Sequence, residues 1–225
     1  MKRFLFWGLI VIILGGTVFA LAKLPKKEIA SPGQGQVVQL ATITAADWVA
    51  GNKESAVTLV EYSDFQCPAC AAYYPLIKKM LKENSQDFQF VYRHFPLRQH
   101  AQAKDAAYAA EAAGRQGKFW EMTDLIFNGQ TSWAGKVNAK DIFLEYAKSL
   151  NLNLEKFNQD RNSGEIKDRV EKDLQDGLGI GANSTPSFYL AGRKIQPRNY
   201  DEFVNFIKQA GAATPPPAGG PSVTP

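Results

Sequence analysis

The two cysteines of the 225-residue chain, Cys67 and Cys70, are spaced as C-x-x-C. An apolar, β-branched run at 57–62 precedes them, and a helical pattern over 67–84 begins at them. Residues three apart share a face of a helix, so the two sulfurs can meet. Free backbone N–H groups and the positive dipole end favour a thiolate at the helix N-terminus. Because a thiolate is the species that attacks a disulfide, the spacing predicts redox chemistry, with Cys67 as the attacking thiol and Cys70 as its partner.

Two other interpretations of the cysteine pair, a structural disulfide and a zinc site, have weaker support. A structural disulfide that closes a four-residue loop contributes only about 2 kcal/mol, against about 5 kcal/mol for a 100-residue loop. A zinc site would need Cys67, Cys70, His94 and His100, but the gap from Cys70 to His94 exceeds the usual roughly 12–15 residues. Pro68 suits the first turn of a helix, where no backbone N–H is needed. Redox chemistry is therefore the favoured interpretation.

The elements around the pair follow from changes in hydrophobic period. We expect a strand–helix–strand unit with a parallel pair and a crossover, then an almost wholly helical block, then two short strands and a helix. Asn138 is expected to cap one helix of the block. The expected ranges are 57–62, 67–84 and 88–92 for the first unit, 100–176 for the block, and 187–190, 194–195 and 200–210 for the last part.

An uncharged apolar segment lies near the start of the chain. It covers 19 residues, 4–22, close to the about 20 that cross a bilayer as a helix. We expect a membrane anchor. A cleaved signal peptide is the alternative, because Lys2 and Arg3 form a basic start and residues 20–22 fit a small-x-small cleavage site. Either segment would place the rest of the chain outside the cytoplasm, at the cell surface, in the periplasm or secreted.

Beyond the apolar segment, charge and composition indicate a linker, a folded domain and a tail. Five of the 26 basic residues lie within 1–27, which leaves 21 against 22 acidic ones. A nucleic-acid-binding protein would carry its basic excess on the folded part, so we expect no nucleic-acid partner. Residues 23–42 are expected to be a linker, and the Pro/Gly-rich residues 211–225 a disordered tail. The predicted folded domain is 43–210.

Three segments, in order, resemble the DsbA-like branch of the thioredoxin superfamily. They are residues 60–70 (VEYSDFQCPAC), 92–97 (YRHFPL) and 181–188 (GANSTPSF). The helical block lies where that branch carries its helical insertion, and the resemblance covers roughly 48–210. It implies an α/β, thioredoxin-like fold with a helical insertion, about 100–176, between a β-α-β half and a β-β-α half.

The resemblance also implies how a client would be held. Pro186 matches the cis-proline of the family, which faces the cysteine pair. Thr185 would offer backbone groups to an extended client peptide, a recognition that is indifferent to client sequence. The client-binding residues implied in this way are Thr185, Pro186, Pro68 and Ala69.

Glu61 lies six residues before Cys67, where related enzymes carry a buried acid that handles the proton of the deeper cysteine. A carboxyl in an apolar strand should have a raised pKa and can act as a base near neutrality. The alternative is that Glu61 faces water at the end of its strand. Asp64 is expected to be a turn or capping residue, and His94 a structural one.

The function implied is that of a protein thiol–disulfide oxidoreductase that donates disulfides to unfolded or reduced secreted proteins. It would use no cofactor besides the Cys67–Cys70 disulfide and would need a redox partner that reoxidises it. Strongly oxidising members often carry His between the cysteines, where this chain has Ala69, so isomerase or reductase activity stays open. The alternative from another class is a non-enzymatic, membrane-tethered peptide-binding module with a structural disulfide.

Overall fold

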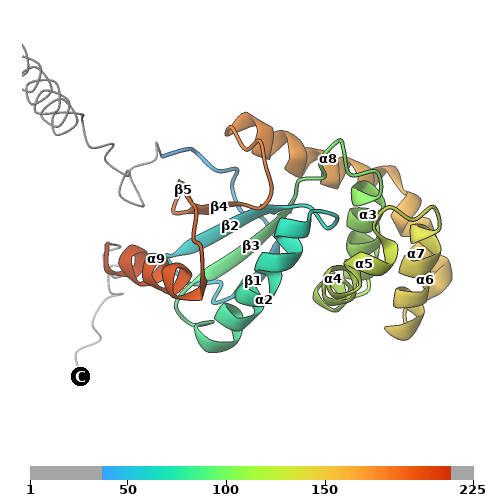
Figure 1. The fold of residues 1–225 in the computed structure, drawn as a ribbon, viewed down its shortest axis with the longest axis horizontal. Coiled ribbons are helices and arrows are strands. Elements are labelled where there is room, and N and C mark those ends of the chain that lie inside the picture. Colours follow the sequence, from blue (N-terminus) through green and yellow to red (C-terminus); the bar gives the residue numbers. More distant parts are fainter. Residues whose placement is uncertain (1–36, 214–225) are drawn as a thin grey trace, which may run out of the picture. The chain divides into compact units, whose positions relative to one another are not determined.

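Five strands form one mixed sheet, shown in Figure 1. The computed structural model describes residues 37–213 of the chain. The strand order is β1-β3-β2-β4-β5, in which β2 and β3 are parallel and the other neighbours are antiparallel. The strands are β1 (Trp48–Gly51), β2 (Thr58–Ser63), β3 (Gln89–His94), β4 (Ser187–Leu190) and β5 (Arg193–Ile195).

The helices divide into two sets. The first set, α2 (Pro68–Glu83) and α9 (Tyr200–Ala213), covers one face of the sheet. The second set lies between β3 and β4 in the chain, and in Figure 1 most of it forms one group beside the sheet, from which α8 leads back. This arrangement confirms the predicted α/β order, with a helical block between two halves. The block consists of α3 (Ala103–Gly114), α4 (Phe119–Asn128), α5 (Gln130–Trp133), α6 (Ala139–Ser149), α7 (Leu154–Asn162) and α8 (Gly164–Gly179).

Successive side chains of each strand point to opposite faces of the sheet. In β2, Leu59 belongs to the core cluster that includes α2 and α9. Val60 and Tyr62 belong to the second cluster, against which α8 packs. Glu61 and Ser63 therefore share the face of Leu59, below α2. This register puts a carboxyl and a hydroxyl under the helix that begins at the cysteine pair.

Helix α8 packs unusually close to the sheet at Gly177. A Cβ atom at this position would lie 2.7 Å from Cδ2 of Phe95 and 2.8 Å from Cδ1 of Tyr62. Both rings are fully buried, so neither can move aside. Because Gly177 has no side chain, α8 can pack against the face of the sheet that carries Val60 and Tyr62.

Three local features differ from the sequence predictions. The edge strand β1 was not predicted, because four residues give too short a pattern, and it is specified by pairing with β3. The four-residue helix α5 was also missed. Asn138 makes no side-chain capping bond, so that prediction is wrong, whereas the Asn153 side chain accepts from Lys156 N at 2.9 Å and caps α7.

The segments flanking the predicted domain are described only in part. Of the predicted linker, residues 37–42 are described, and Val38 N donates to Gly192 O at 2.8 Å while Ala41 O accepts from Arg93 Nη2 at 3.0 Å. At the other end α9 continues to Ala213. Over residues 37–213 the structure has no helix with the length and apolar character of a membrane span. The predicted anchor, 4–22, lies outside the described residues.

We predict that Gly177→Ala lowers the free energy of unfolding by about 1–2 kcal/mol, because overpacking against two buried rings outweighs the gain in helix propensity. Gly179→Ala is the control, since a Cβ there meets nothing within 4 Å. It should leave stability unchanged or raise it by about 0.5 kcal/mol. Urea unfolding of the two variants checks this, and equal effects would show that the close approach of α8 is not constrained at Gly177.

Candidate active site

The cysteine pair lies at the start of α2. Cys67 is the residue before the first helical position and has an extended backbone, with φ −74° and ψ 122°, and Pro68 occupies the first turn as predicted. Cys67 is 7% exposed and Cys70 is fully buried. Both are free thiols in this structure. The helix N-terminus therefore faces the outer sulfur, while the inner one lies beneath it.

The surroundings of Cys67 favour its thiolate. A hydrogen bond with the Cys70 thiol lowers the pKa of Cys67 to about 5, against the opposing cost of burial. The Thr185 side chain and the backbone N–H groups of Cys70 and Ala69 act in the same lowering direction. The Thr185 hydroxyl is buried and makes no other hydrogen bond of standard geometry. It is therefore free to donate to the Cys67 sulfur. The predicted stabilisation at the helix start is thus joined by donors from outside the helix.

Cys70 is affected in the opposite direction. Burial raises its pKa above the ordinary value, and the hydrogen bond to Cys67 and the charge of Glu61 raise it further. Asp64 N approaches Cys70 Sγ at 3.5 Å and opposes these effects. The two sulfurs of one motif therefore differ sharply in acidity.

Glu61 is buried, 4% exposed, and does not face water. Burial raises its pKa to about 7, the nearby Ser63 hydroxyl opposes this, and the charge of Cys67 adds to it. Tyr92 lies opposite Glu61 in β3. The hydroxyls of Ser63 and Tyr92 are buried and make no hydrogen bond of standard geometry. A carboxyl that is half protonated near neutrality thus lies among polar groups below the pair.

The loop before β4 approaches the outer sulfur from the other side. The Thr185–Pro186 peptide bond is cis, as the resemblance implied. Cys67 Sγ lies 3.4 Å from Thr185 O. Among the hydrogen bonds of residues 37–213, none uses the Thr185 N–H. Cys67, Thr185 and Pro186 are therefore brought together from positions more than 100 residues apart.

Asp64 organises the turn between β2 and α2. Its Oδ1 accepts from Gln66 N at 2.7 Å. Its Oδ2 accepts from Leu97 N at 2.8 Å and lies 2.7 Å from His100 Nδ1. The predicted turn residue is therefore also the link between this turn and the segment that follows β3.

The zinc alternative is not supported by the positions of its residues. His100 contacts Asp64, while His94 Nε2 lies 2.8 Å from Glu111 Oε1 in the interior. Within the part of the chain that the structure describes, no three His, Cys, Asp or Glu side chains are grouped to hold a metal ion.

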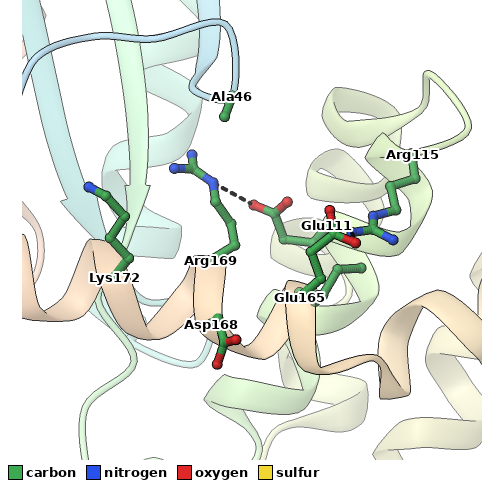
Figure 2. Close-up of a pocket in the computed structure, with 8 residues that line it drawn as sticks. Ala46, Glu111, Arg115, Glu165, Asp168, Arg169 and Lys172 are labelled. Carbon is green, nitrogen blue, oxygen red and sulfur yellow. Dashed lines mark ion pairs between the residues drawn. The ribbon is translucent and has the colours of Figure 1, made fainter.

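Among the hollows of residues 37–213, two lie beside the helical insertion. The larger, about 560 Å³, lies between the segment after β3 and α8, and Asn183, close to Thr185, is part of its wall. The smaller, about 360 Å³, lies over Arg169 of α8 (Figure 2). Arg169 is matched there by acids, with Asp173 at 3.2 Å and Glu111 at 3.9 Å. We assign the smaller hollow to the junction of the insertion with the sheet, because Arg169 is already paired there with acids.

Sequence reasoning missed Gln130, a buried residue of α5 whose side chain bonds to the turn that carries Cys67. No local pattern signals it, because α5 has only four residues and the contact spans more than 60 positions.

Comparison with known sequences identifies a family. Residues 44–209 match the model of a family described as Thioredoxin. The sodium/proton antiporter NhaA 1 of Mycolicibacterium gilvum is 37% identical over 151 residues, 66% of this chain and 24% of that protein. NhaA 1 of Salinispora arenicola is 39% identical over 150 residues, 66% of this chain and 22% of that protein. The chain thus spans about a quarter of the length of these relatives.

Solved structures support the fold. BdbD from Bacillus subtilis superposes with a TM-score of 0.69 at 22% identity, over 79% of this chain and 98% of that one. Wolbachia pipientis alpha-DsbA1 gives 0.68 at 19% identity, over 76% and 94% of the two chains. A thioredoxin-like oxidoreductase from Silicibacter pomeroyi gives 0.65 at 24%, over 76% and 95%. The chain belongs to the thioredoxin family and has the fold of DsbA-like thiol–disulfide oxidoreductases.

Proposed function

We propose that the chain catalyses thiol–disulfide exchange with other proteins, and that it donates disulfides. The observation that carries this is the opposite displacement of the two thiol pKa values, to about 5 at Cys67 and upward at Cys70. The outer sulfur is then a thiolate at neutral pH and a good leaving group, while the inner sulfur holds its proton. A purely structural disulfide would need no such difference.

The exchange proceeds in two displacements. A client thiolate attacks Cys67 Sγ of the oxidised enzyme, the Cys67–Cys70 bond breaks, and Cys70 leaves with the bonding electrons and takes up a proton. A second client thiolate then attacks the client sulfur of the mixed disulfide and releases Cys67 as a thiolate. The client loses two electrons to the enzyme, which ends as the dithiol.

Glu61 is proposed to exchange the proton of Cys70. Its charge and that of Cys70 are coupled, and its pKa of about 7 suits both giving and taking a proton near neutrality. Cys70 is fully buried, so solvent cannot readily exchange its proton. Glu61 can, because its carboxyl lies on the face of the sheet below α2.

Client binding is proposed at Thr185 and Pro186, with Pro68 and Ala69 on the other side of the sulfur. The unused Thr185 N–H and its carbonyl can pair with an extended backbone, which gives affinity without sequence preference. The hollow of about 560 Å³, of which Asn183 forms part of the wall, offers room for client side chains. These features suit reduced or unfolded proteins as clients.

The proposed direction of disulfide transfer follows from the stability of the Cys67 thiolate. Whatever stabilises the Cys67 thiolate stabilises the reduced enzyme, which makes its disulfide more readily given away. A separate redox partner must then reoxidise the pair. This supports disulfide donation over reductase or isomerase work, although Ala69 lacks the cation that a histidine would supply between the cysteines.

We place the domain outside the cytoplasm, held at the membrane by residues 4–22. The support is the length and apolar character of that segment. Release after cleavage near residue 22 remains the alternative.

The reduced protein should show one thiol that ionises near pH 5. Iodoacetamide alkylation measured against pH should follow a single titration at about 5, with Cys70 unreactive at neutral pH. The control is Cys67→Ser, whose remaining thiol should react slowly up to pH 9. An apparent pKa above 8 for Cys67 would remove the basis of the proposal.

Substitution of each cysteine should give different outcomes. Cys67→Ser should abolish disulfide transfer to a reduced client, because the variant cannot form the Cys67–Cys70 disulfide that a client thiolate attacks. Cys70→Ser should instead accumulate mixed disulfides, because the resolving thiol is absent. Non-reducing gels make the comparison, with reduced, unfolded ribonuclease as the client of Cys67→Ser and scrambled, disulfide-bonded ribonuclease as the client of Cys70→Ser, because the Cys67 thiolate needs a client disulfide to attack. Turnover by Cys67→Ser would refute the assignment.

Glu61→Gln should slow turnover at pH 7 by about 10- to 100-fold, because it removes the proton carrier of Cys70 but keeps the shape of the side chain. In the unsubstituted protein, the reverse half-reaction, in which the reduced pair reduces a client disulfide, needs the Glu61 carboxylate to take the Cys70 proton. Its rate should therefore rise with pH through about 7, and this limb should vanish in the variant.

Glu121→Gln, at a half-exposed acid of α4, is the control for Glu61 and should leave both rate and profile unchanged. An unaltered pH profile in Glu61→Gln would show that another group carries the proton.

A further inference from the structure

We propose that Gln130 is a positioning residue through which the helical insertion controls the reactivity of Cys67. The inference rests on the proposed function, because it concerns how the same thiol is tuned. Gln130 lies in α5, and its side-chain amide donates to backbone carbonyls and not to the sulfur. It acts through the backbone of the turn that precedes α2.

The contact is a two-pronged clamp. Gln130 Nε2 donates to Phe65 O at 2.7 Å and to Cys67 O at 3.0 Å. One amide group thereby uses both of its N–H bonds on the two carbonyls that flank Gln66. The Gln130 side chain is 9% exposed, so these bonds lie in a shielded environment where misalignment is costly.

The clamped carbonyls belong to the helix start. Cys67 O also accepts from Ala71 N at 3.2 Å, the first turn of α2. The backbone N–H groups of Ala69 and Cys70, which favour the thiolate, are in that same turn. Fixing the Cys67 carbonyl therefore fixes the orientation of the donors around the sulfur, a preorganisation of the kind that charged sites require.

The clamp is itself rigidly held. Trp133, at the other end of α5, is fully buried and its Nε1 donates to Ile126 O at 2.8 Å. A Cβ on Gly129, the residue before Gln130, would lie only 2.0 Å from Tyr146 Oη, so α6 presses directly on this turn. Well-packed parts of the insertion therefore hold Gln130 in position.

A second tie joins the insertion to the same turn. Gln66 Nε2 donates to Gln102 Oε1 at 3.0 Å, and Gln102 N donates back to Gln66 Oε1 at 2.7 Å. Gly135 N donates to Gln102 Oε1 at 3.0 Å. Among the side chains that the structure describes, however, Gln130 alone bonds to the main chain of Cys67.

The test compares Gln130→Met with Gln116→Met. Methionine keeps the length of the side chain and removes both donors. Gln116 is a matched control, because it also bridges backbone groups within the insertion, with Nε2 to Asn153 O at 3.1 Å and Asn153 N to Oε1 at 2.9 Å. The readout is the pH titration of Cys67 by alkylation of the reduced, full-length protein, with folding checked by circular dichroism.

We expect the Cys67 titration to move upward by about 0.5–1 pH unit in Gln130→Met, roughly a three- to tenfold loss of thiolate on the acid side. It should not move in Gln116→Met, even where that variant is less stable. Gln130→Asn, which keeps an amide but cannot span both carbonyls, should shift the titration in the same direction and serves if the Met variant unfolds.

An unmoved titration in a folded Gln130 variant would overturn the inference and leave Gln130 as a stabilising contact only. Failure of the proposed function is recognised separately. In that case the unsubstituted protein would itself show an ordinary thiol at Cys67, whatever the Gln130 variants do.

Discussion

The arrangement of backbone donors around one sulfur is the interaction on which this structure depends. Helix α2 begins at Pro68, so its first N–H groups, which have no partner within the helix, surround Cys67 Sγ. Hydrogen bonds from the Cys70 thiol and from the Thr185 side chain add to them. The sheet supplies the turn that starts the helix, and the segment before β4 closes over it.

Burial divides the pair into two chemically different groups. Favourable contacts at Cys67 and desolvation at Cys70 act on sulfurs one helical turn apart, so the proton stays on the inner one. Glu61 is placed by the alternation of β2 on the face below the pair, where desolvation keeps its pKa near neutrality. The proposed donation of disulfides draws on the same asymmetry, because whatever stabilises the Cys67 thiolate stabilises the reduced enzyme.

Much of this could be read from local sequence, but the long-range contacts could not. The C-x-x-C spacing, the strand before it and the helical block have local periodicities, and their observed bounds lie within a few residues of the predicted ones. The cis bond and the role of Thr185 needed the family resemblance. Strand β1, the Asp64–His100 contact and the Gln130 clamp depend on pairings across 36 or more residues that no local pattern encodes. Asn138 shows the reverse case, in which a good capping residue is present but unused.

The reduction potential of the Cys67–Cys70 pair tests the central claim most directly, because it measures how far the fold stabilises the thiolate and hence the reduced state. It can be obtained by equilibrating the purified protein with glutathione buffers and counting reduced thiols. The account predicts a potential less negative than about −200 mV, on the side of known disulfide donors. A value near about −270 mV, typical of a reductant, would contradict it.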